Sequence, residues 1–207
     1  TALYQDLEGA VRSGKTTIAL SKVIARCQAY PGLRAMICRW KEQEAYGQLK
    51  ARLVELFGPG LIWHAEEGYF ELDGDSRIYV RGLKPGEETS RYSKFAGLTL
   101  AIIYIDQPEE VPRDFYDALK ARLSQPSYPH EMYLTPNPLD EGHWLSKEFP
   151  EANSHPDQLY IRTTVYDNRV ALGERYIQEL ERAYPVGHPL RARYIEGRRT
   201  GARCPTL

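Results

Sequence analysis

Residues 9–16 read GAVRSGKT and decide the fold, because they match the pattern G-x-x-x-x-G-K-[S/T]. Glycines in this pattern let the backbone curl, so that its N–H groups point at phosphate oxygens. The lysine then reaches the β- and γ-phosphates, the hydroxyl after it ligates Mg²⁺, and the following helix adds its positive dipole end. We predict a nucleotide site formed by Gly9, Ala10, Val11, Arg12, Ser13, Gly14, Lys15, Thr16 and Thr17.

Working outward from this loop, strand-like and helix-like segments alternate. A short strand at residues 2–8 precedes the loop and an amphipathic helix at 15–29 follows it. Further strands are predicted at 34–39, 98–106, 131–134 and 158–163, and further helices at 41–57, 112–123, 143–149, 172–184 and 189–196. This alternation predicts an α/β fold of the P-loop NTPase class (ASCE/RecA-like), with a mainly parallel sheet flanked by helices.

Two regions depart from that alternation. Residues 61–81 contain three strand-like pieces around Asp73-Gly74, which predicts a β-hairpin elaboration. The last fifty residues read mainly as short helices, which predicts a small C-terminal helical subdomain. We therefore expect a P-loop core at 1–157 and this subdomain at 158–207.

Composition narrows the class of protein. Of 207 residues, 42% are hydrophobic and 27% charged, which excludes a disordered chain, a collagen and a coiled-coil rod. No apolar run approaches the roughly 18 residues of a membrane span, so no membrane partner is expected. The three cysteines lack CxxC spacing, which disfavours a disulfide scaffold and a zinc site.

The net charge of −1 hides an asymmetry. Residues 105–159 hold eleven acidic and four basic side chains, a balance of −7. Residues 160–207 hold nine arginines and five acids, a balance of +4. This basic C-terminal portion is either a solvated surface or a surface that faces a polyanion or a neighbouring subunit. The near-neutral net charge of the whole chain therefore does not exclude a nucleic-acid partner.

A P-loop enzyme also needs an acid at the end of a neighbouring buried strand to hold the Mg²⁺ shell. The apolar run that ends at Asp106 supplies it. Three interpretations of the water-activating group remain open. In the first, Glu110 reaches the water, with Glu109 as the second choice. In the second, Gln107 positions the water without taking its proton. In the third, Gln107 is an engineered replacement of a glutamate, made to trap bound ATP.

Six motifs follow one another in an order that resembles the order found in the large terminase subunit of tailed bacteriophages. That protein is the ATPase that packages DNA. The motifs read GAVRSGKTT, IIYIDQPEEVP, LTPNP, GHWLSKEF, VYDNRVALGERYIQELE and RYIEG, and together they extend over nearly the whole chain. This order is far more specific than the P-loop alone.

The resemblance identifies residues 158–207 as the small helical lid and linker subdomain of the family, and it implies further roles. Thr135, Pro136, Asn137 and Pro138 correspond to the coupling motif that links hydrolysis to movement. An arginine from the next subunit completes the site in this family, and we rank Arg91 first, then Lys94, then Arg122. Independently of the resemblance, the position of Arg12 inside the loop makes it either an additional phosphate contact or an exposed side chain. The chain departs from the pattern in that Gln107 stands where a glutamate is expected after Asp106.

The resemblance also implies ATP and Mg²⁺ as cofactors. Double-stranded DNA, the portal protein and the small terminase subunit are the implied partners. The location would be the host cytoplasm, and copies would form a ring although the isolated domain is a monomer. We expect the family's nuclease domain to follow about where this chain ends, so DNA cutting is not assigned to it. A helicase-type translocase and a nucleotide-binding assembly module with little hydrolysis remain as alternatives.

Overall fold

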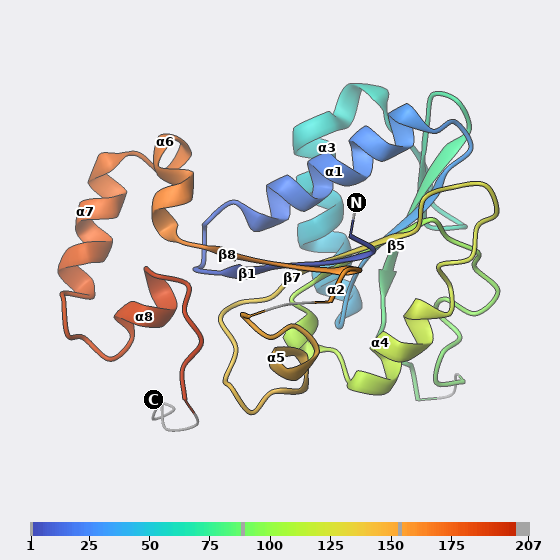
Figure 1. Ribbon diagram of the computed structural model, residues 1–207. Coiled ribbons are helices and arrows are strands. Elements are labelled where there is room, and N and C mark those ends of the chain that lie inside the picture. Colours follow the sequence, from blue (N-terminus) through green and yellow to red (C-terminus); the bar gives the residue numbers. More distant parts are fainter. Residues whose placement is uncertain (1, 88–89, 153–154, 202–207) are drawn as a thin grey trace. The chain divides into compact units, whose positions relative to one another are not determined.

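The computed structural model describes residues 2–87, 90–152 and 155–201 (Figure 1). The chain divides into two compact parts. The central part is Thr17–Leu134, and the terminal part is Thr1–Thr16 together with Thr135–Leu207. Each part is described by itself, and the predicted boundary between residues 157 and 158 stays a prediction.

The central part contains a largely parallel arrangement of strands. Its strands are β2 (Arg34–Arg39), β3 (Ile62–His64), β4 (Tyr69–Leu72), β5 (Ser76–Gly82) and β6 (Ile102–Asp106), with β7 (Glu131–Thr135) ending at the boundary. Their order is β3-β4-β5-β2-β6-β7. Strand β2 pairs in parallel with both β5 and β6, whereas β4 is antiparallel to β3 and β5. All five residues of β6 are buried, as expected of a strand covered on both faces.

The β-hairpin prediction is confirmed. Leu72 pairs with Ser76 across a turn in which Gly74 has φ of 81° and Asp75 has φ of 62°. Glycine adopts such a positive φ without steric cost, and aspartate tolerates it better than most residues. The Asp-Gly pair therefore marks the turn correctly.

Helices pack on the strands of the central part from two sides. They are α1 (Lys15–Ala29), which begins in the terminal part, α2 (Glu42–Glu44), α3 (Ala51–Phe57) and α4 (Arg113–Lys120), with 3₁₀ turns at Gly58–Gly60 and Pro108–Glu110. Figure 1 shows α1 and α3 on one side and α4 on the other. Leu20, Val23 and Leu53 join Ile37 and Ile78 in one fully buried core.

Two predicted elements of the central part differ in detail. The helix expected at 41–57 is helical throughout, but Ala45–Lys50 forms a π-helical turn between α2 and α3. The strand expected at 98–106 begins only at Ile102, and Leu100 makes an isolated bridge to Leu123. An apolar run reports burial and not strand pairing, so Leu100 and Ala101 lie buried without belonging to the strand, whereas Leu98 and Thr99 are half-buried.

The terminal part is built on two parallel strands. Strand β1 (Tyr4–Gly9) pairs with β8 (Gln158–Thr163), with Gly9 opposite Thr163. The helices of this part are α5 (Trp144–Glu148), α6 (Arg169–Leu172), α7 (Glu174–Ala183) and α8 (Arg191–Tyr194), with a 3₁₀ turn at Val165–Asn168. In Figure 1, α6, α7 and α8 form a cluster after β8.

The C-terminal helices have a small core of their own. Val165, Ile177 and Ile195 are buried together with Ala10, a residue of the nucleotide loop. The predicted helical elements after residue 158 are therefore present, and they pack on the loop itself. In the described residues, no helix combines the length and apolarity needed to span a membrane.

Candidate functional site

The nucleotide loop begins where β1 ends against β8. A Cβ atom at Gly9 would lie 2.1 Å from the carbonyl oxygen of Thr163, so only glycine fits this position. The Ala10 N–H donates to that same oxygen at 3.0 Å. The Ser13 and Thr163 hydroxyls share a hydrogen bond of 2.8 Å. The last residue of β8 therefore fixes both the start and the middle of the loop.

Two residues of the loop have left-handed backbone conformations. Arg12 has φ of 63° and Gly14 has φ of 91°. The first is unusual for a residue with a Cβ atom. The Asn168 side chain donates to the Arg12 carbonyl oxygen at 2.8 Å and so supports this turn. Arg12 itself is exposed, as a side chain that contacts phosphate from outside the loop would be.

The Lys15 ammonium group lies inside the loop. Its side chain is buried, and its Nζ donates to the carbonyl oxygens of Gly9 at 2.7 Å and Ala10 at 2.8 Å. These contacts place a cation where α1 begins, and the first turn of α1 contains no acidic residue. A buried cation at a helix N-terminus without a competing carboxylate fits an anionic phosphate group.

The two threonines after Lys15 differ in their surroundings. Both are half-buried. The Thr17 hydroxyl accepts a hydrogen bond of 3.1 Å from Arg52 within the central part. Thr16 is the last residue of the terminal part, whereas the other predicted Mg²⁺ ligand, Asp106, belongs to the central part. A metal site that joins Thr16 and Asp106 therefore stays a prediction.

The predicted coupling segment follows β7 and lies next to the loop. Thr135, Pro136 and Pro138 are buried, and Asn137 is half-buried. The Gly9 N–H donates to the Pro136 carbonyl oxygen at 3.4 Å. The structure thus joins the first residue of the nucleotide loop to the coupling segment through the backbone.

Asp106 lies at the end of β6, as predicted. It is 8% exposed and accepts a hydrogen bond of 2.8 Å from the Tyr104 hydroxyl. The Arg39 Nε lies 3.3 Å from the other carboxylate oxygen. Arg39 was not predicted as a site residue, although it follows the four apolar residues 35–38 at the end of this strand. A charged residue at the end of a buried strand was the available signal.

Arg39 also explains where Gln107 points. Gln107 has φ of 52° and ψ of 57°, so the chain turns sharply directly after Asp106. Its side-chain oxygen accepts a hydrogen bond from the Arg39 guanidinium. The 3₁₀ turn Pro108–Glu110 follows, in which Glu109 is half-exposed and Glu110 is exposed. The structure thus places both predicted catalytic acids on one short turn.

The candidate trans-acting cations have partners within their own chain. Arg91 Nε donates to the Asp114 carboxylate at 2.8 Å, and the Arg91 side chain is 60% exposed. The carboxylate of Asp114 raises the pKa of Arg91. The Lys94 ammonium donates to Glu42 at 2.5 Å. Both cations lie on the surface of the central part.

The RYIEG motif provides a second glycine that packs on the loop. Gly197 has φ of 63°, and a Cβ atom there would lie 2.0 Å from the Thr163 oxygen and 2.9 Å from the Ala10 nitrogen. No role was predicted for Thr163, Asn168 or Gly197. Asn168 and Gly197 lie inside matched motifs, which was the available signal, whereas Thr163 lies outside all of the matched motifs.

Comparison with solved structures gives three informative relatives. The large terminase of the thermophilic bacteriophage D6E, solved with ADP, is 20% identical with a TM-score of 0.78, and the match covers 95% of this chain and 48% of that one. The ATPase domain of the Thermus phage P74-26 large terminase is 17% identical with a TM-score of 0.64, over 97% of this chain and 90% of that one. The HK97 bacteriophage large terminase is 14% identical with a TM-score of 0.67, over 96% and 47%.

At such low sequence identities the structural similarity shows the fold alone, and it confirms the predicted P-loop ATPase fold. This chain spans about half the length of the D6E terminase and nine-tenths of the P74-26 ATPase domain. A comparison with curated protein sequences gives no match. The family described as phage terminase large subunit has a sequence model that matches residues 3–197, which is nearly the whole chain. The predicted resemblance is therefore confirmed, and the chain belongs to the phage terminase large subunit family.

Proposed function

We propose that this chain is the Mg²⁺-dependent ATPase motor domain of a viral terminase large subunit, and that it drives double-stranded DNA into a procapsid. The observation that carries the proposal is the nucleotide loop, in which Lys15 lies buried at the start of α1 and the backbone is curled by Gly9 and Gly14. Membership of the terminase family supports the motor role. The D6E terminase has been solved with ADP and with ATP-gamma-S.

The proposed mechanism assigns the phosphates to the loop. Its N–H groups, Lys15 and Arg12 bind the β- and γ-phosphates, since Lys15 can exchange its two carbonyl partners for phosphate oxygens. The Thr16 hydroxyl and the Asp106 carboxylate are the proposed ligands of Mg²⁺. The metal would neutralise charge on the β- and γ-phosphate oxygens.

Proton removal from the attacking water is assigned to Glu110, with Glu109 as the second choice. The hydrogen bond from Arg39 supports this assignment, because it takes one of the two acceptor positions of the Gln107 side-chain oxygen and turns the amide toward Arg39. Arg91 or Lys94 of a neighbouring copy would stabilise charge on the transferred phosphoryl group. Thr135–Pro138 would transmit the result, and the Gly9–Pro136 hydrogen bond supports that role.

The partners are proposed from the family. They are double-stranded DNA, the portal protein, the small terminase subunit and further copies of this chain in a ring, in the host cytoplasm. The isolated chain would be a monomer. DNA would be held mainly through its phosphates, so the affinity of the chain for duplex DNA should fall steeply as the salt concentration rises from about 50 to 200 mM. An unchanged duplex affinity over that range would contradict this mode of binding.

A steady-state phosphate-release assay tests the ATPase proposal. Lys15→Ala should abolish release, because it removes the loop's buried cation. Lys147→Ala is the matched control, since Lys147 is an exposed lysine on α5. Release that rises more than linearly with protein concentration would support a trans-acting cation. Equal release from the Lys15→Ala and unmodified chains would exclude the proposed site.

One observation favours a second candidate function, a nucleotide-binding module with little hydrolysis. The residue after Asp106 is an amide, and its oxygen is bound by Arg39. The absence of release at every concentration, with ADP binding that depends on Lys15, would support this module over the motor.

A further inference from the structure

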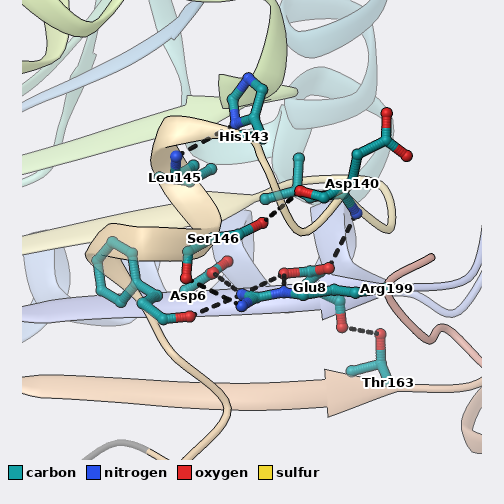
Figure 2. A network of polar contacts seen from close by, with 10 residues as sticks. Asp6, Glu8, Asp140, His143, Leu145, Ser146, Thr163 and Arg199 are labelled. Carbon is teal, nitrogen blue, oxygen red and sulfur yellow. Dashed lines mark hydrogen bonds and ion pairs between the residues drawn. The ribbon is translucent and has the colours of Figure 1, made fainter. Parts of the chain in front are cut away.

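A buried arginine, Arg199, lies in a polar network around the strand that leads into the nucleotide loop (Figure 2). Its side chain is 7% exposed. Its Nε and Nη2 approach one carboxylate oxygen of Glu8 at 2.8 and 2.7 Å. Glu8 is fully buried and is the residue immediately before Gly9. Arg199 therefore holds the last side chain of β1 before the backbone turns into the loop.

The second carboxylate oxygen of Glu8 has a different partner. It accepts a hydrogen bond of 3.0 Å from the Leu139 N–H. Leu139 follows Pro138 directly, so one carboxylate connects the start of the nucleotide loop to the end of the segment 135–138. The contact depends on how the carboxylate is rotated, and Arg199 fixes that rotation from the opposite oxygen.

The Arg199 guanidinium is itself held in one orientation. It donates to the carbonyl oxygens of Ser146 at 3.1 Å and Phe149 at 2.7 Å, and it lies 4.8 Å from the centre of the Tyr160 ring. Burial lowers the pKa of Arg199, but Glu8, Tyr160 and Asp6 together outweigh burial, and the net pKa is raised. The side chain is therefore a fixed, fully charged fork, a geometry that lysine does not reproduce.

The residue after Arg199 docks on the same segment. The Thr200 N–H donates to the Leu139 carbonyl oxygen at 3.2 Å, and the Thr200 carbonyl oxygen accepts from the Glu141 N–H at 3.2 Å. The Thr200 hydroxyl donates to Asp140 at 3.3 Å. Residues 199–200 thus bind both the strand before the loop and the backbone after Pro138.

We propose that Arg199 is a positioning residue for the nucleotide loop, acting through the Glu8 carboxylate. Arg199 orients Glu8, Glu8 holds the Leu139 N–H, and the end of β1 is fixed so that Gly9 and Ala10 direct the loop toward phosphate. Because coupling free energies are reciprocal, nucleotide binding also stabilises the docked state of residues 199–200. The proposal rests on the proposed nucleotide site but assigns it two residues that lie outside the P-loop motif.

The test compares Glu8→Gln and Arg199→Gln with Arg198→Gln as the matched control. Arg198 is the neighbouring arginine, its side chain is 59% exposed, and it pairs with Glu196. Affinity for a fluorescent ADP analogue and the KM and kcat of ATP hydrolysis are measured well below each melting temperature. Both network variants should weaken ADP binding by about tenfold and raise KM by a similar factor. The kcat should stay within about threefold, because the groups proposed for the chemical step are unchanged.

Arg199→Lys and the double variant Glu8→Gln/Arg199→Gln separate positioning from stability. The double variant removes the charges of Glu8 and Arg199 together, so neither stays buried without the other, and only Asp6, 3.9 Å from Arg199, loses an ion-pair partner. It should therefore fold even where Arg199→Gln alone does not. Its ADP affinity should remain weak, and Arg199→Lys should recover only part of the affinity. A double variant with unmodified ADP affinity would show that the network only stabilises the fold, and would overturn the proposal.

Lys15→Ala distinguishes this proposal from the proposed function. If Lys15→Ala leaves ADP binding unchanged, the nucleotide site itself is wrong. If Lys15→Ala abolishes ADP binding while the folded Glu8 and Arg199 variants bind normally, only the positioning role is wrong.

Discussion

The Arg39 guanidinium donates to the Gln107 side-chain oxygen and also lies 3.3 Å from the Asp106 carboxylate. Arg39 is 3% exposed and has further contacts with Gln48 and Glu44, so it does not move independently of its surroundings. The amide oxygen of Gln107 is therefore engaged, and the acids of the Pro108–Glu110 turn are left as the proton acceptors nearest in sequence to Asp106.

The first prediction concerns those acids. Glu110→Gln should lower kcat by about a hundredfold or more, as loss of a general base does, while the ADP affinity stays unchanged. Glu109→Gln is the matched control on the same turn, and phosphate release is the measurement. If Glu109→Gln has the larger effect, the two assignments are reversed.

The second prediction concerns the trans-acting cation. Arg91→Ala should lower kcat in the assembled ring by about a thousandfold, because it removes a charge from the transferred phosphoryl group. It should leave the fold intact, since its ion pair with Asp114 is exposed. Mixing Arg91→Ala chains with Lys15→Ala chains should restore activity, because each supplies what the other lacks. Full activity of Arg91→Ala alone would contradict the assignment and transfer the role to Lys94.

The third prediction concerns a buried glycine. Gly197→Ala places a Cβ atom 2.0 Å from the Thr163 oxygen at φ of 63°, so it should lower the free energy of unfolding by about 1–3 kcal/mol. It should also weaken ADP binding, because Thr163 holds the Ala10 N–H. Urea denaturation measures the first effect. Gly142→Ala has open space around its Cβ atom and serves as the control.

The fourth prediction concerns alkaline pH. Burial raises the pKa of the Cys27 thiol from 9.0 to about 12. Between these values the unfolded chain releases a proton that the folded chain keeps, so stability falls as pH rises, by roughly 1.4 kcal/mol per unit from this group. Burial raises the pKa of Cys38 as well, which adds a loss of the same sign.

Urea denaturation between pH 8 and 11 checks this slope. Cys27→Ala should make the decline shallower over that window. Val23→Ala, in the same core on the same helix, should lower stability equally at every pH. Parallel curves for Cys27→Ala and the unmodified chain would show that the thiol does not contribute.

Local patterns were enough to predict most of the fold. The helix over residues 15–29 and the turn at Asp73-Gly74 are encoded within a few residues, so the sequence marks them directly. The nucleotide loop and Asp106 were found in the same way, because each motif is contiguous. Pairing partners are different, since they depend on which strands become neighbours.

The supporting residues of the site could not be predicted for that reason. Arg199 is one of nine arginines after residue 159, and nothing near it indicates a buried partner at Glu8. Arg39 contacts Gln107 only because β2 and β6 are adjacent. Such contacts arise from tertiary structure, because a charged side chain that becomes buried needs a polar or oppositely charged partner beside it.

The pairing of β1 with β8 has a consequence for the order of folding. Strand β1 cannot form its pairing until Gln158–Thr163 is present, and the packing around Gly9 and Ala10 is completed only by Gly197. A ribosome synthesises the whole central part before any of these partners emerges. Since contacts distant in sequence form late, strand β1 reaches its final shape later than the central part, and a nascent chain acquires affinity for nucleotide only after residue 197 has emerged.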